Sequence, residues 1–140
     1  MEKLKLVNPR DREAAEAGTL PPEQVRTVTI DALVDTGATM MVLPADVVDR
    51  VGVKASGTRK LRYADGRVAE VPWVTLWIEL LGRETACNAL VQPAGTEPLI
   101  GQIPLEELDL VVDPKNQRLL VNPASPEMPR MDAVGAIVIG

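Results

Sequence analysis

With 140 residues, the chain is long enough for one domain with a substantial core but too short for two lobes. Its net charge of −5 disfavours nucleic acid and anionic membrane surfaces as partners. The absence of His, together with a single Cys, excludes Ser-His-Asp and Cys-His catalysis and any metal site built from His or from several Cys.

The N-terminal residues Met1–Leu6 alternate charged residues with leucine and lack the apolar core of a signal peptide. No stretch approaches the ~20 apolar residues of a membrane span, so we expect a cytoplasmic location without membrane association. Leu4–Val7 is predicted to form a first strand that ends at Asn8-Pro9. Residues 11–17 are predicted to form a short helix or a solvated turn, ended by Gly18.

The next predicted strand runs from Val25 to Val34 and leads directly into Asp35. Its alternation predicts a buried face formed by Val28, Ile30, Ala32 and Val34. A buried strand that ends on a charge is unusual unless the charge has a function. Gly37 allows a backbone conformation closed to other residues, and the Thr36 hydroxyl can tie the turn together, so we expect a fixed carboxylate. Asp35 is therefore a candidate catalytic residue.

A buried strand and a short helix are predicted to follow this turn. Met40–Leu43 has the apolar run of a buried strand, and Pro44 starts a helix over Ala45–Val51 that is capped by Gly52. The helix is expected to bury Val47, Val48 and Val51.

A hairpin is predicted over residues 58–71. Thr58–Tyr63 and Val68–Val71 have the composition of strands, and the Asp-Gly pair between them, Asp65-Gly66, is typical of a tight turn.

A second hairpin is predicted to follow, because residues 73–80 alternate like a strand and Leu81-Gly82-Arg83 can turn into a further strand ending at Val91. Cys87 lies in that strand among apolar neighbours, so we expect a buried thiol without a function.

The last third of the chain contains a strand, a helix and a final hairpin. Leu99-Ile100-Gly101 is predicted to be a strand that ends before a helix over residues 103–108. Leu110–Asp113 and Arg118–Asn122 form the hairpin. We expect a domain over residues 1–122, followed by a Pro-punctuated linker and an apolar tail over residues 123–140.

Two of these segments together resemble a known family. Leu33–Thr39 is similar to the active-site signature of aspartic proteases, specifically the short, retroviral-type enzymes, and Leu99-Ile100-Gly101 resembles their second element, whose strand crosses beside the catalytic loop. The resemblance covers roughly Leu4–Asn122. It implies a mainly β, single-domain, retropepsin-like closed β-barrel of the acid-protease type with one or two short helices.

The chain contains only one Asp-Thr-Gly triplet, so the resemblance implies a homodimer that hydrolyses peptides or unfolded proteins with one Asp35 from each subunit and without a metal or cofactor. It also implies roles for the rest of the active-site loop: Thr36 braces the two loops across the axis, Gly37 offers backbone hydrogen bonds to substrate, and Ala38 leaves room for it.

By the same resemblance, the first hairpin corresponds to the mobile flap that closes over substrate, with its tip at Tyr63, Ala64, Asp65 and Gly66.

The chain departs from the retroviral pattern at two positions, where Thr39 and Gln102 replace a charged pair of the family. We expect a hydrogen bond between Thr39 and Gln102 in place of that pair. Met40, next along, is expected to alter a substrate subsite.

Two alternatives remain open: a non-catalytic dimeric module of the same fold that binds peptides or proteins, and a monomeric ligand-binding barrel that leaves Asp35 unexplained. The tail over Ala133–Gly140 is expected either to add a strand to the dimer interface or to occupy the substrate cleft, unless it is an unstructured end.

Overall fold

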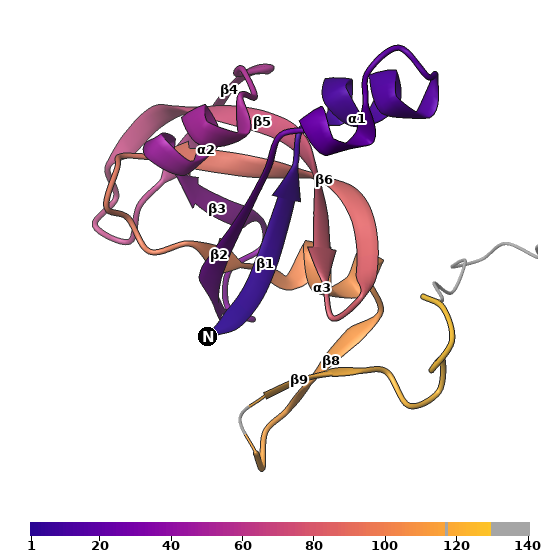
Figure 1. Ribbon diagram of the computed structural model, residues 1–140. Helices are drawn as coiled ribbons and strands as arrows, with labels where there is room; N and C mark the ends of the chain where they lie inside the picture. The colour runs from indigo at the N-terminus through magenta and orange to yellow at the C-terminus, as the bar shows by residue number, and fades with distance from the viewer. Residues whose placement is uncertain (117, 130–140) are drawn as a thin grey trace, which may run out of the picture.

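The computed structural model describes residues 1–116 and 118–129 (Figure 1). The strands are β1 (Glu2–Val7), β2 (Thr27–Val34), β3 (Met41–Pro44), β4 (Gly57–Arg62), β5 (Val68–Leu80), β6 (Arg83–Gln92), β7 (Leu99–Ile100), β8 (Leu110–Asp113) and β9 (Arg118–Val121). The helices are α1 (Pro9–Glu16), α2 (Ala45–Val51), α3 (Gln102–Glu107) and a short 3-10 helix, Pro22–Gln24. The three α-helices within residues 1–116 and 118–129 are one more than the one or two expected.

Seven strands form one sheet in the order β1-β2-β7-β3-β6-β5-β4, and β1 also pairs with β5. The second pairing joins Lys5, Leu6 and Val7 to Glu79, Ile78 and Trp77, so the sheet closes on itself and β4 extends from it as the outer strand of a hairpin. The β2–β7 and β3–β6 pairs are parallel. The mainly β fold expected from the sequence is thus confirmed.

The core is made of aliphatic side chains, as the composition predicts. In the second half of β5, alternate residues point inward, and those that are buried are Val74, Leu76, Ile78 and Leu80. The same alternation in β2 buries Ala32 and partly buries Val28, Ile30 and Val34. Because side chains alternate with period two along a strand, these faces were predictable from the sequence.

Helix α2 has the bounds that the sequence predicted, and Gly52 caps it. The Gly52 N–H donates to the carbonyl oxygens of Val48 and Asp49. Gly52 has φ +78°, a left-handed conformation that glycine adopts without the steric cost that a Cβ would bring. The buried Asn8 amide donates to the carbonyl oxygens of Val51 (3.0 Å) and Gly52 (3.3 Å), while its Oδ1 caps helix α1 at Asp11 N–H. One side chain thus holds two helix ends together.

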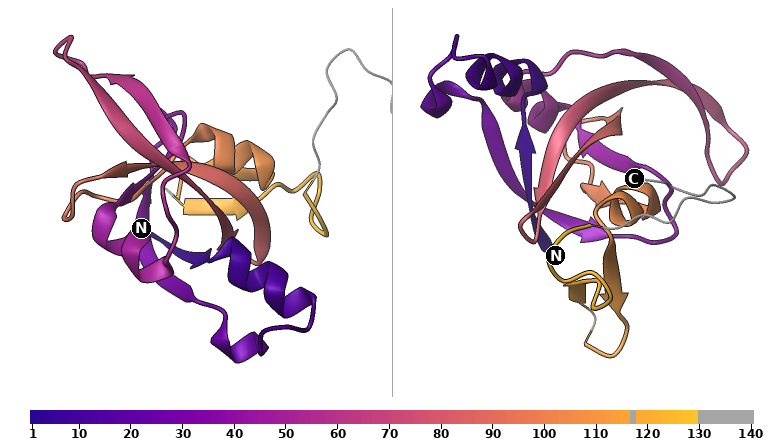
Figure 2. Two further views of the ribbon diagram at one scale, coloured as in Figure 1. Left: turned by 90° about the horizontal axis from the view of Figure 1, so that it is seen from above. Right: turned by 90° about the vertical axis from the view of Figure 1, so that its right-hand side faces the viewer.

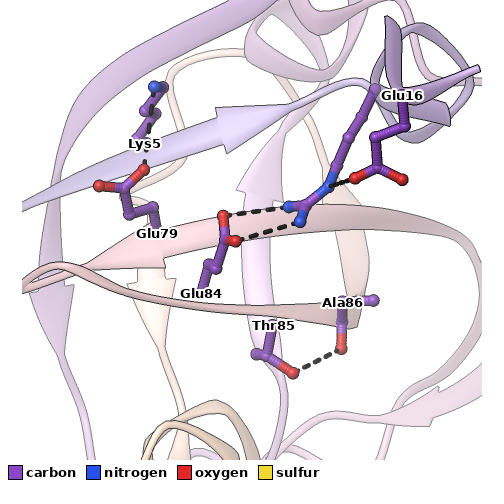
Figure 3. A network of polar contacts seen from close by, with 7 residues as sticks. Lys5, Glu16, Glu79, Glu84, Thr85 and Ala86 are labelled. Carbon is purple, nitrogen blue, oxygen red and sulfur yellow. Dashed lines mark hydrogen bonds and ion pairs between the residues drawn. The ribbon is translucent and has the colours of Figure 1, made fainter. Parts of the chain in front are cut away.

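Helix α1 is attached to its surroundings through Asp11, which accepts hydrogen bonds from Arg26, and through Arg12. The Arg12 guanidinium donates to both oxygens of Glu84 (3.0 and 3.1 Å) and to Glu16 (3.2 Å), the two carboxylates labelled in Figure 3. It also lies 3.7 Å from the centroid of the Trp77 ring. Nearby, Lys5 and Glu79 form a longer ion pair of 3.8 Å across β1 and β5.

The β8–β9 hairpin forms a separate two-stranded sheet that extends from the barrel on the side of the N-terminus (Figure 1). Its base is held by the buried Arg83, which donates to the carbonyl oxygens of Leu108 (3.0 Å), Asp109 (2.9 Å) and Ser125. Ser125 belongs to the segment predicted as a linker. The apolar tail over 133–140 lies outside the described residues, so its role stays a prediction.

None of the helices in the part of the chain that the structure describes has the length and apolarity needed to span a bilayer.

Candidate active site

Asp35 is the residue that follows β2, and its position is fixed by β7. Strands β2 and β7 run parallel with Leu33 opposite Leu99 and Val34 opposite Ile100. The Asp35 N–H then donates to the Ile100 carbonyl oxygen at 3.0 Å. The two segments that carry the family resemblance are therefore adjacent in space.

The carboxylate of Asp35 is half-buried and accepts a hydrogen bond from the Gly37 N–H on its Oδ1 at 2.9 Å. The Ala38 N–H closes the turn by donating to the Asp35 carbonyl oxygen at 3.1 Å. Hydrogen bonds thus hold both the backbone and the side chain of Asp35, in agreement with the fixed carboxylate expected from the sequence.

Gly37 and Thr36 act differently from what the sequence predicted. Gly37 does not have a left-handed φ, and what favours glycine there is crowding, because a Cβ would lie 3.2 Å from Asp35 Oδ1. The Thr36 hydroxyl does not tie the turn, since within residues 1–116 and 118–129 it has no hydrogen-bond partner. Thr36 is exposed instead, on the outer side of the loop.

Gly101 holds the far end of the loop by close backbone contact. A Cβ at this position would lie 2.4 Å from the Met40 carbonyl oxygen and 2.8 Å from that of Ala38. Gln102 N–H donates to Ala38 O at 2.8 Å, and Ile103 N–H donates to Thr39 O at 2.9 Å. The Gly at the end of β7 is therefore required by proximity to the active-site loop, which the sequence pattern alone does not reveal.

The expected Thr39–Gln102 side-chain bond is absent from the described residues. The Gln102 amide donates to Glu106 at 3.1 Å, one helical turn along α3. The active-site loop and α3 are joined by their backbones instead.

The β4–β5 hairpin carries the residues assigned to the flap. Its turn is tight, as predicted: Tyr63 N–H donates to Arg67 O at 2.8 Å, Gly66 N–H donates to Tyr63 O at 2.9 Å, and Gly66 has φ +87°. Ala64, Asp65 and Gly66 are exposed, and Figure 2 shows the hairpin extending away from the barrel. Tyr63 is half-buried, with its hydroxyl 3.4 Å from Gln92 Oε1 and its ring under the Arg67 guanidinium.

A groove of about 400 Å³ lies beside the active-site loop, between β2 and the β8–β9 hairpin. Thr36, Leu33 and Val112 are among its lining residues, and Leu33 and Val112 are 42% and 39% exposed. This surface was not predicted from the sequence. A signal was present, because Leu33 occupies the otherwise polar face of β2, next to Asp31 and Thr29.

In residues 1–116 and 118–129, no three side chains of the types that bind metals are grouped as a metal site would require. The Cys87 thiol is buried, as predicted, and burial, with a smaller contribution from Glu107, raises its pKa to about 12.

Comparisons with known proteins agree with this geometry. A family model described as aspartyl protease matches residues 22–103, more than half of the chain. Among solved structures, the chain is similar to EIAV protease complexed with the inhibitor HBY-793, with 18% identity and a TM-score of 0.52 over 77% of this chain and 86% of that one.

The solution structure of simian foamy virus (mac) protease also matches, with 16% identity and a TM-score of 0.46 over 75% of this chain and 93% of that chain. No curated protein matches this chain. At such identities, the likeness to EIAV protease concerns the fold, which is that of a retroviral protease.

Proposed function

The chain belongs to the aspartyl protease family, and on this premise we propose that it is an aspartic endopeptidase that acts as a homodimer, with one Asp35 from each subunit. The observation that carries the proposal is the way Asp35 is held. Its backbone is bonded to Ile100 and its carboxylate to the Gly37 N–H, on a loop whose outer residue, Thr36, is exposed. A carboxylate fixed in this way can meet a second copy without losing its orientation.

The chemistry follows from two carboxylates facing each other. Both cannot ionise at low cost in close proximity, so the pair shares one proton, as aspartic proteases do in general. The ionised Asp35 takes a proton from a water molecule, which attacks the peptide carbonyl carbon, while the protonated Asp35 of the partner subunit donates a hydrogen bond to the carbonyl oxygen. The amine then leaves with a proton from the dyad. Since one proton must stay on the pair, we expect activity on the acidic side of neutrality.

The surface around Thr36 supports a dimer. The β8–β9 hairpin packs Leu110 and Leu119 into the core, whereas Val112 (39% exposed) lines the groove together with Leu33 (42% exposed). A second copy placed with its Asp35 opposite would cover these side chains. It would also give the Thr36 hydroxyl, which has no partner among the described residues, its counterpart across the axis.

The β4–β5 hairpin supports a role as a flap. Its tip is exposed and contains glycine, and a hairpin of this kind can close on an extended peptide and exclude water from the dyad. The rival function, a peptide-binding module without catalysis, would use the same dimer and the same hairpin. It gives no reason for two carboxylates to be held face to face.

The test is cleavage of an unfolded protein at acidic pH by the wild type and by Asp35→Asn, with the oligomeric state of both measured by sedimentation. We expect both to form dimers and only the wild type to cut. Asp31→Asn is the matched control, because Asp31 lies on the same strand but pairs with Lys3 at the surface, and it should keep full activity. A wild type that binds peptides without cutting them, or a variant at Asp35 that still cuts, would show that the proposed dyad is wrong.

A further inference from the structure

A cavity of about 290 Å³ lies between the flap hairpin and the end of the active-site loop. Its lining side chains come from the end of the active-site loop, β4, β5, β6 and α3, and include Met40, Arg59, Thr75, Asn88, Ile103 and Glu107. Two of its lining residues are connected to the active-site loop: Met40 follows Thr39 in the chain, and Ile103 N–H donates to the Thr39 carbonyl oxygen at 2.9 Å. A volume near the lower end of the ~300–1,000 Å³ of ligand pockets suits one side chain better than several residues.

The cavity contains one charge of each sign. The Arg59 guanidinium has no carboxylate within ion-pair distance in the part of the chain that the structure describes, and lies 5.2 Å from the Trp73 ring centroid. Glu107 accepts a hydrogen bond from the Thr85 hydroxyl on Oε2 at 3.1 Å. Both groups can therefore interact with a bound molecule.

The uncharged residues of the cavity supply further hydrogen-bond donors and an apolar surface. Thr75 donates its hydroxyl to Asn88 Oδ1 at 2.8 Å, which fixes the orientation of that amide and leaves its Nδ2 hydrogens as donors. Met40 and Ile103 contribute apolar surface, and Ile103 is 42% exposed.

We propose, building on the endopeptidase function above, that this cavity binds one side chain of the peptide substrate and selects glutamine. The two charges together favour a neutral side chain, because the attraction of either one for an ionised side chain is offset by repulsion from the other, whereas an apolar side chain would leave the donors and the carboxylate desolvated and unpaired. A primary amide offers its oxygen to Arg59 or Asn88 and its hydrogens to Glu107. The two methylenes of glutamine pack against Met40 and Ile103, which favours glutamine over asparagine.

The test uses peptide binding to Asp35→Asn, which separates recognition from cleavage. The peptides consist of alanine and valine with a single glutamine, which is placed at each position in turn. At the position that gives the tightest binding, glutamine is then replaced by Glu, Lys or Leu. We expect glutamine to bind more tightly than each replacement by roughly 2- to 12-fold, the range given by one net hydrogen bond.

Two charge-removing variants should then change the preference in opposite directions. In the Asp35→Asn background, Arg59→Gln should shift the preference toward the Lys peptide, and Glu107→Gln should shift it toward the Glu peptide. Lys60→Gln is the matched control, because Lys60 is the next residue of β4 and does not line the cavity, so the preference should stay unchanged.

The selection of glutamine by this cavity would be refuted by any of three results: equal affinities for the peptides, no measurable binding of any of them, or equal effects of Arg59→Gln and Lys60→Gln. Cleavage by the wild type is scored separately. If the wild type cuts the peptides without an amide preference, the cavity proposal fails and the endopeptidase stands. If the variant shows the preference but the wild type cuts nothing, the endopeptidase proposal fails instead.

Discussion

Replacing Gly101 with alanine tests whether close contact with the active-site loop is what requires glycine there. Gly101 has φ −88° and ψ −175°, an extended conformation that any residue adopts, so backbone preference predicts almost no cost. The added Cβ, however, would lie 2.4 Å from Met40 O and 2.8 Å from Ala38 O. These are backbone atoms, and moving them would stretch the bonds that Gln102 and Ile103 N–H donate to the loop at 2.8 and 2.9 Å.

The cost can be estimated from these contacts. Overpacking costs ~1–3 kcal/mol, and weakening two backbone hydrogen bonds adds ~0.5–1.5 kcal/mol each. We therefore expect Gly101→Ala to lower the free energy of unfolding by about 2–6 kcal/mol, measured by urea denaturation. Cleavage should fall as well, because the displaced loop carries Asp35.

Gly95→Ala is the control for this substitution. Gly95 has φ +89°, where alanine is strained, but a Cβ there would meet nothing within 4 Å. A left-handed conformation costs a non-glycine residue ~1–2 kcal/mol, so Gly95→Ala should be the milder change. If Gly95→Ala were the more damaging of the two, or if Gly101→Ala changed stability by less than ~0.5 kcal/mol, the steric argument would be refuted.

Three further predictions concern other parts of the fold. Hydrogen bonds from Arg26 hold the pKa of Asp11 below its usual value of 3.8. The Asp11 carboxylate therefore stabilises the fold above about pH 4, and this contribution is lost as the pH falls through its lowered pKa. The difference in free energy of unfolding between the wild type and Asp11→Asn, followed by urea denaturation, should shrink below about pH 4. Burial raises the pKa of Cys87 to about 12, so a thiol reagent at pH 8 should label it in urea but not in the folded protein, and rapid native labelling would contradict this. Arg12→Ala should cost about 1–2 kcal/mol, from its Trp77 stacking and its ion pairs, and a change within ~0.5 kcal/mol would mean that α1 is held in another way.

The local elements of this fold were predictable from the sequence because they depend on short-range patterns. The period of two identified the buried face of β2 and predicted a strand over the second half of β5, and Gly52 marked the end of α2. The adjacency of Asp35 and Ile100 followed from the family resemblance rather than from any local pattern.

The long-range features were not predictable in the same way. Nothing near Leu6 in the sequence indicates that β1 pairs with β5 to close the sheet, because that register depends on residues about 70 positions apart. The burial of Arg83 depends on carbonyl groups from three later residues. Likewise, the approach of Arg59 to Met40 follows from the path of the flap hairpin.

The measurement that tests the central claim most directly is cleavage by mixtures of wild-type and Asp35→Asn chains at constant total concentration, after unfolding and joint refolding. If each active site needs one Asp35 from each of two subunits, mixed dimers are inactive and activity falls with the square of the wild-type fraction. At equal amounts, about a quarter of the full activity should remain. A linear fall, with about half of the activity remaining, would mean that one Asp35 is sufficient and would contradict the shared dyad.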